Sequence, residues 1–400
     1  MKKYLTSEVK SFIKEHLQDD VKALALKKSP FEEVPYKWVL EQIVGRQKGA
    51  HKLSAWVDNE EIIMPSQLSY EQSSSNATAR YKAGLINKGD RVLDMTGGFG
   101  VDDSAFAETA AEVIYCERNQ DLANIASHNF EVLKKNNIKV FNTDSVDFMR
   151  NQKSDSFDLV YLDPARRNES NKKMVGLMDC EPNPLELMEQ CSVISRRMLI
   201  KASPMIDISL VCHQLARVKQ VHVVAIKDEL KEVLFDVDLR GESDGVPKIT
   251  AVNIGRSHLE IVFDATLESE ANVEYSDPLN FIYEPNVALL KSGCFKYLAE
   301  RLQVKKIAQH SHLYTSTELV DFPGRSFEII RPLTSNKKDV RVHISTGKAN
   351  ITTRNFPLSV DQLRKKMQLK DGGEDYVIAT TLSNKKPVIL QCRKTTGFIK

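Results

Sequence analysis

The sequence predicts an α/β protein with a doubly wound sheet. Several short apolar runs each end in an acidic residue. The distance between successive runs is that of a strand followed by a helix that leads to the next strand. The first of these runs leads directly into a glycine-rich turn, after which residues 101–104 begin a helix. With 400 residues and 42% hydrophobic content, the chain is long enough for substantial cores in more than one domain.

The first strand and its turn, residues 91–100, read RVLDMTGGFG. Glycines in such a turn let the backbone bend tightly and approach a ligand at the start of the next helix. A dinucleotide pyrophosphate favours a third glycine at position 103, but an aspartate stands there. We expect cofactor binding at this turn by Asp94, Thr96, Gly97, Gly98 and Gly100.

The charges around the turn indicate which cofactor it binds. Asp94 precedes the turn and Asp102 and Asp103 follow it, so these carboxylates would repel phosphate. The same charges suit a cofactor with an ammonium and a sulfonium group, and S-adenosylmethionine (SAM) fits that description. A flavin or nicotinamide cofactor is the alternative.

The second and third strands end in acids suited to an adenosine. The run 112–117 ends in Glu117, one crossover after Asp94, where such sheets place the acid that holds ribose hydroxyls. The run 139–144 ends in Asp144, which we expect to receive the adenine amino group. Each feature alone is also explained by a turn or a helix cap, but the ordered series favours a SAM-binding fold.

The charge distribution separates the end of the chain from the rest. Residues 326–400 include fifteen Lys or Arg and six Asp or Glu, although the whole chain has a net charge of only +2. A basic module beside a mildly acidic body indicates binding to a polyanion, and a lysine-rich soluble surface is the alternative. Lys365 and Lys366, in a helix predicted for 359–367, are candidate substrate-binding residues.

Cysteine and histidine usage predicts a reduced protein without a metal site. The six cysteines form no C-x-x-C pair, and the start of the chain shows neither a secretory leader nor a long apolar run. His310 and His312 have no cysteine nearby in the sequence, so we expect them to be solvated or to cap an element. The sequence predicts a cytoplasmic protein with no membrane segment, and it leaves the oligomeric state open.

Four regions follow one another along the chain. Residues 1–64 have helical patterns, and residues 65–272 contain the glycine turn and the acidic strand ends. Residues 273–324 include a helix predicted for 286–302. In the last region, residues 325–400, we predict strands at 327–331, 340–345, 350–353, 374–381 and 386–392.

Residues 72–75, with the sequence Gln-Ser-Ser-Ser, come before a small helix and lack the pattern of a core segment. Their hydroxyl and amide groups are suited to cap that helix and to contact the methionine end of SAM. We expect capping alone for most of them.

Three stretches resemble bacterial class I SAM-dependent methyltransferases with a C-terminal THUMP-like domain. They are the glycine turn 94–102, the segment 71–82 and the Asp-Pro-Ala-Arg-Arg run 163–167. The resemblance covers nearly the whole chain and implies a Rossmann-like methyltransferase core after an N-terminal helical region. It also implies a ferredoxin-like segment over 273–324 and a THUMP-like domain over 325–400. Because THUMP modules in other proteins bind structured RNA, it implies an RNA substrate, either tRNA or rRNA.

The end of the fourth strand departs from the pattern of methyltransferases that act on base nitrogens. That pattern has Asp or Asn, two prolines and an aromatic ring that stacks on the extruded base. This chain has Asp163, Pro164, Ala165 and Arg166 instead, which puts methylation of an exocyclic adenine or cytosine amine in doubt. No cysteine follows the proline to attack a pyrimidine, so a purine nitrogen such as guanine N1 or N2 is the favoured target.

Arginines take the place of the missing ring. Arg166 would stack by its guanidinium plane or clamp a phosphate, with Arg167 assisting as a substrate-binding residue. The alternative is that one of them pairs with Asp163 or Asp158.

Asp163, Pro164 and Arg166 are the predicted catalytic residues, and Asp163 would accept the proton or orient the nucleophile. Lys201, in a fifth strand at 198–204, would bind phosphate or a base carbonyl, and a salt bridge to a strand-end carboxylate is equally expected. A methyltransferase of small molecules or proteins, and a noncatalytic RNA-binding protein with a retained cofactor fold, are the alternative functions.

Overall fold

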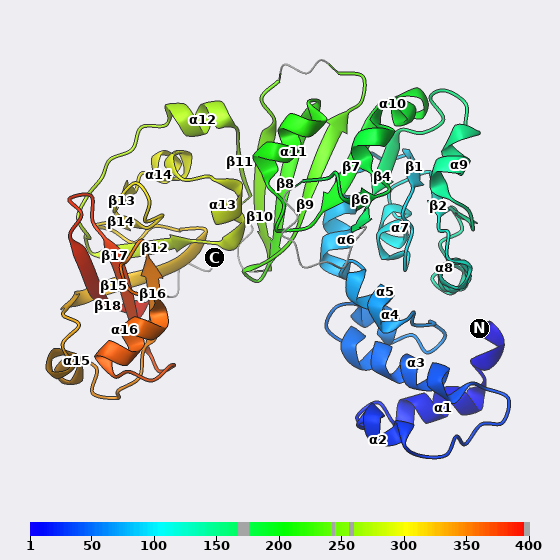
Figure 1. Cartoon of the computed structure of the whole chain (residues 1–400), viewed down its shortest axis with the longest axis horizontal. Helices are drawn as coiled ribbons and strands as arrows, with labels where there is room; N and C mark the ends of the chain where they lie inside the picture. The colour runs from blue at the N-terminus through cyan, green and yellow to red at the C-terminus, as the bar shows by residue number, and fades with distance from the viewer. Residues whose placement is uncertain (167–175, 242–244, 256–259, 396–400) are drawn as a thin grey trace. The chain divides into compact units, whose positions relative to one another are not determined.

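The computed structural model describes residues 1–166, 176–241, 245–255 and 260–395. Two compact units divide the chain. The first comprises Met1–Gln220 with Lys231–Gly245, and the second comprises Val221–Leu230 with Val246–Lys400. The elements of both are drawn in Figure 1.

The first unit begins with short helices, as expected for residues 1–64. Thr6 caps the first of them by accepting a hydrogen bond from the Val9 amide, and Val9 and Ile13 are buried along one stripe. The helices are α1 (Ser7–Glu15), α2 (Val21–Ala25), α3 (Tyr36–Gly49), α4 (Ser54–Val57), α5 (Gln67–Gln72) and α6 (Asn76–Ala83), with a 3₁₀ turn η1 (Lys2–Tyr4) before them.

A sheet with the order β9-β7-β4-β1-β2-β3 forms the centre of the first unit. Its strands are β1 (Arg91–Asp94), β2 (Glu112–Cys116), β3 (Ile138–Phe141), β4 (Leu159–Leu162), β7 (Arg197–Ala202) and β9 (Glu229–Asp238). β1 pairs in parallel with both β2 and β4, and β9 pairs antiparallel with β7. The strand order reverses beside β1, and ligands bind at such a position in open α/β sheets.

Helices connect these strands, and the central strands are buried. All four residues of β4 are at most 1% exposed, as expected for a parallel strand that is covered on both faces. The connecting helices are α7 (Val101–Phe106), α8 (Gln120–Val132), α9 (Ser145–Arg150), α10 (Pro184–Ile194) and α11 (Ile208–Leu215). A small two-stranded ladder of β5 (Ala165–Arg166) and β6 (Cys180–Glu181) follows Pro164.

The second unit contains a seven-stranded sheet with the order β13-β14-β12-β15-β18-β17-β16. These strands are β12 (Phe281–Pro285), β13 (Lys305–Lys306), β14 (Tyr314–Ser316), β15 (Gly324–Leu333), β16 (Asn350–Arg354), β17 (Asp375–Thr381) and β18 (Pro387–Lys394). β8 (Val218–Ile226), β10 (Lys248–Ile254) and β11 (Ile261–Phe263) have the order β11-β10-β8. The helices of this unit are α12 (Ala265–Glu270), α13 (Val287–Ser292), α14 (Lys296–Arg301), α15 (Lys337–His343) and α16 (Val360–Met367).

Two predicted elements of the second unit were wrong. The strand predicted at 340–345 is largely helix α15, because Asn336 caps it through the Lys338 amide and Val340 and Ile344 are buried four residues apart. The helix predicted over 286–302 is divided into α13 and α14 at Gly293, whose φ of +81° ends the first helix.

None of the helices in the described ranges is both long and apolar enough to cross a membrane.

Candidate active site

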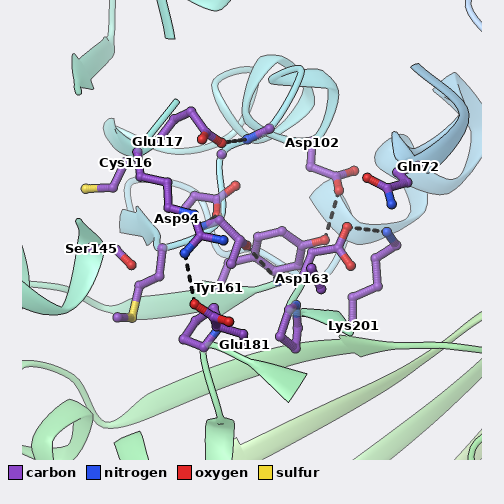
Figure 2. Close-up of a pocket in the computed structure, with 18 of the residues that line it drawn as sticks. Gln72, Asp94, Asp102, Cys116, Glu117, Ser145, Tyr161, Asp163, Glu181 and Lys201 are labelled. Atoms are coloured by element: carbon purple, nitrogen blue, oxygen red, sulfur yellow. Dashed lines mark hydrogen bonds and ion pairs between the residues drawn. The ribbon is translucent and has the colours of Figure 1, made fainter. Parts of the chain in front are cut away.

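A cavity of about 1110 Å³ opens at the carboxyl ends of β1, β2, β3 and β4 in the first unit (Figure 2). The expected cofactor residues all line it, as do Asp163, Pro164 and Lys201. Lys365 and Lys366 lie on α16 in the second unit. Arg166 belongs to β5, but its side chain and all of Arg167 lie outside the described part of the chain.

The glycine turn lines the cavity and packs closely against two buried aromatic rings beneath it. A Cβ atom on Gly97 would collide with the ring of Tyr115, and one on Gly100 would collide with the ring of Phe130. Gly100 also has a φ of +79° where it begins α7. The Tyr115 hydroxyl donates a 2.6 Å hydrogen bond to the Gly98 carbonyl, so the turn is fixed from below.

Glu117 and Asp144 are held by backbone amides at the ends of β2 and β3. The two carboxylate oxygens of Glu117 accept hydrogen bonds from the Gly98 amide at 3.0 Å and the Asn119 amide at 2.7 Å. Asp144 caps α9 through its Oδ1 atom alone. Each carboxylate therefore keeps lone pairs that can accept from a ligand in the cavity.

Thr96 links the ends of β1 and β4. Its hydroxyl donates to Asp94 Oδ1 at 3.0 Å and accepts from the Asp163 amide at 2.7 Å. The Thr96 amide also donates to Asp94 Oδ1 at 2.7 Å. The single hydroxyl hydrogen of Thr96 is thus already used, and the clearest effect of this residue is to hold two strand ends together.

Asp102 and Asp103 have a different role from the one the sequence suggested. Both are buried in α7, where burial and the neighbouring carboxylates of Asp94 and Asp102 raise the pKa of Asp103 well above its usual range. Asp102 accepts from the hydroxyls of Tyr161 and Ser74 and pairs with a buried lysine. Burial also raises the pKa of Asp94 to about 7, so the turn is less negative than its three acids suggest.

The buried lysine is Lys82, which the sequence did not single out as a functional residue. Its side chain is 0% exposed, and its ammonium binds Glu232 at 2.8 and 2.9 Å, Ser74 at 3.0 Å and Asp102 at 3.2 Å. This cluster joins α6, α7 and β9 beneath the cavity. Because Lys82 and Glu232 are 150 positions apart, no local pattern could reveal the pair; a lysine in a helix of small residues was the only signal.

Asp163 and Lys201 form an ion pair inside the cavity, with the Lys201 ammonium on Asp163 Oδ2 (Figure 2). Burial by itself would lower the pKa of Lys201, but Asp163, Glu232 and Asp102 together raise it, so the ammonium stays charged. The alternative that Lys201 bridges to a strand-end carboxylate is confirmed. Asp163 Oδ1 has no hydrogen-bond partner among the described residues, and the side chain is 34% exposed.

Comparisons with known proteins agree with this site. A Porphyromonas gingivalis W83 protein, described provisionally as a methyltransferase, is 31% identical and superposes with a TM-score of 0.86 over 97% of this chain and 98% of its own. This chain belongs to the same methyltransferase family. Family models described as conserved hypothetical protein 95, a ferredoxin-like domain and a THUMP-like domain match residues 72–192, 281–323 and 324–394.

A curated relative matches a fifth of the chain. An uncharacterised protein of Methanocaldococcus jannaschii is 35% identical over 83 residues, which are 20% of this chain and 29% of that protein. The chain therefore spans less than a third of the length of this relative. The match to the Porphyromonas protein, which covers nearly the whole chain, confirms the expected Rossmann-like core with ferredoxin-like and THUMP-like parts.

SAM is the cofactor of such methyltransferases, and the residues of the cavity fit it. Glu117 would hold the ribose hydroxyls, and Asp144 Oδ2 would receive the adenine amino group. The glycine turn, into which no Cβ fits at Gly97 or Gly100, would pass beside the amino acid end. Apolar side chains also line this space, namely Met95, Phe99, Leu122 and Val146.

Proposed function

We propose that this methyltransferase modifies a purine nitrogen in structured RNA, either tRNA or rRNA. The observation that carries the proposal is the Asp163–Lys201 pair, in which Asp163 Oδ1 has no hydrogen-bond partner among the described residues, in a cavity otherwise suited to SAM. Strand-end carboxylates of this kind can accept the hydrogen of a base N–H.

In the proposed reaction, Lys201 and Thr96 orient the Asp163 carboxylate, and Asp163 accepts the proton. SAM, when bound, supplies an electrophilic methyl group. The Lys201 ammonium binds Asp163 Oδ2, and the Asp163 amide donates a hydrogen bond to the Thr96 hydroxyl. Together these two interactions fix the orientation of Asp163 Oδ1. Asp163 then accepts a hydrogen bond, and finally the proton, from the target nitrogen. Pro164 stiffens the backbone directly after Asp163.

The second unit supports an RNA substrate. Its THUMP-like match at 324–394 includes α15 and α16, which pack on one hydrophobic core. Lys365 and Lys366 are exposed on α16, and within the described ranges neither forms an ion pair. Unpaired lysines on one helix suit the phosphates of a nucleic acid.

We extend the proposal to a cytoplasmic location. None of the six cysteines, which all lie in the described ranges, forms a disulfide, and burial raises the pKa of Cys191 and Cys392 to about 12. Cysteines that form no disulfides agree with a reducing compartment.

The decisive experiment incubates the purified chain with methyl-labelled SAM and separate tRNA and rRNA pools. After digestion to nucleosides, label is expected in a methylated purine of one pool. Label in protein or small molecules alone, with none in either RNA pool, would refute the RNA assignment.

Replacing Lys365 and Lys366 together by alanine is expected to weaken RNA binding and to reduce the slope of log Kd against log salt by about two. Two phosphate contacts are removed, while the cavity in the first unit is untouched. Filter binding at several salt concentrations measures the slope, and calorimetry should show unchanged SAM affinity. Lys27 and Lys28, an exposed pair in the first unit, provide the matched control; an equal effect there would contradict a specific role for α16.

A further inference from the structure

The polar segment 72–75 contains one side chain that the fold does not use. Ser73 donates to the Tyr70 carbonyl at 2.8 Å, Ser74 donates to Asp102 at 2.8 Å, and Ser75 caps α6 at the Thr78 amide. Gln72, at the end of α5, lines the cavity and is exposed. Its amide has no hydrogen-bond partner in the described part of the chain, so the three serines have structural roles and Gln72 has none.

Lys52 anchors this end of α5. It donates hydrogen bonds to the carbonyls of Tyr70 and Glu71 at 2.8 and 3.0 Å. Burial, and then the charges of Lys201 and Lys231, lower the pKa of Lys52 to about 8. The two residues before Gln72 are therefore fixed, and Gln72, Lys201 and Lys231 line the same cavity.

Figure 2 shows the Gln72 amide directed into the same part of the cavity as the Asp163–Lys201 pair. That part lies at the ends of β4 and β7, away from Glu117 and Asp144, which follow β2 and β3. A ligand that fills it faces three groups: a carboxylate that accepts, an ammonium that donates and an amide that does both.

We propose that Gln72 binds the target base and determines which base the site accepts. An amide presents one donor and one acceptor in a plane, which matches the adjacent donor and acceptor groups on the edge of a nucleobase. With Asp163 and Lys201 on the same ligand, Gln72 adds a donor and an acceptor for the edge of a base turned out of its stack. This inference rests on the proposed RNA function.

The test compares Gln72→Ala and Gln72→Glu with the natural chain. Both variants are expected to lower kcat/KM for the RNA substrate by about 10- to 100-fold at saturating SAM, because a buried base edge loses its partner. Gln72→Glu keeps the length of the side chain but replaces the donor by a second carboxylate, so it should be no better than alanine. The discrimination between the target RNA and one with a different base at that position should fall as well.

Gln67→Ala is the matched control, because Gln67 lies on the same helix, bonds to Glu71 and does not line the cavity. It should leave kcat/KM and base discrimination unchanged. SAM affinity, measured by calorimetry without RNA, should stay within about twofold in all variants.

Different outcomes separate this inference from the proposed function. If the natural chain labels RNA and Gln72→Ala retains its kcat/KM and its discrimination, Gln72 does not bind the base. Weaker SAM binding in Gln72→Ala, with normal turnover at saturating SAM, would assign Gln72 to the methionine end of the cofactor and overturn the inference. If the natural chain labels no RNA, the proposed function fails and this inference fails with it.

Discussion

Replacing Asp163 by asparagine is expected to lower methyl transfer to RNA by about 10²- to 10⁴-fold, the range for loss of a positioned proton acceptor. Asparagine keeps the size of the side chain, but it cannot accept the proton from the target nitrogen. It also has no negative charge to pair with the ammonium of Lys201. Lys201 retains Glu232 and Asp102 as nearby charges, so the fold should persist. Single-turnover assays with labelled SAM measure the effect.

Binding measurements show whether Asp163→Asn slows the methyl-transfer step or weakens the binding of SAM or RNA. SAM and RNA affinities of Asp163→Asn should remain close to those of the natural chain, because the Glu117 and Asp144 carboxylates and the α16 lysines are untouched. Asp155→Asn is the control, since Asp155 is exposed, precedes the same strand and pairs with Arg240 outside the cavity. Unimpaired turnover in Asp163→Asn would exclude Asp163 as the acceptor.

Replacing Lys82 by methionine is expected to destabilise the first unit by about 3–5 kcal/mol, as for other buried pairs that lose one partner. Methionine fills a similar volume, but the buried carboxylates of Glu232 and Asp102 lose their direct ion-pair partner and keep only the charge of Lys201 nearby. Urea unfolding measures the change, and tryptophan fluorescence reports on this unit because Trp38 and Trp56 both lie in it.

A second substitution separates the ion pair from general packing. Adding Glu232→Gln to Lys82→Met removes the uncompensated carboxylate, so the double variant should be more stable than Lys82→Met alone, with a coupling of about 1–3 kcal/mol. Purely additive losses, or a cost of less than about 1 kcal/mol for Lys82→Met, would contradict a buried charge cluster that holds α6, α7 and β9 together.

The glycine turn and the strand-end acids could be predicted because they are local. A strand, an acid and a tight turn are specified by neighbouring residues, so Asp94, Glu117 and Asp144 were placed correctly along the cavity. The prediction for 340–345 failed because alternating apolar residues suit a strand as well as a short helix. Only packing of Val340 and Ile344 on one core decided between them.

The charges around the glycine turn could be predicted only in part. The sequence correctly indicated an acidic turn, but it could not show that Asp102 lies against Lys82 or that Asp103 is deeply buried. The charge of an acidic side chain depends on its solvent exposure and on partners from distant segments of the chain. A local sequence pattern predicts neither.

The sequence by itself determined the order of the strands in the methyltransferase core, the edge of the sheet at which the cavity opens and the strand-end acids that line it. Tertiary structure alone decided which polar groups remain available for chemistry: it paired Lys201 with Asp163, buried Lys82 with Glu232 and left Gln72 facing the cavity. The physical reason is that hydrogen bonds and ion pairs form between residues brought together by packing, whatever their separation along the chain.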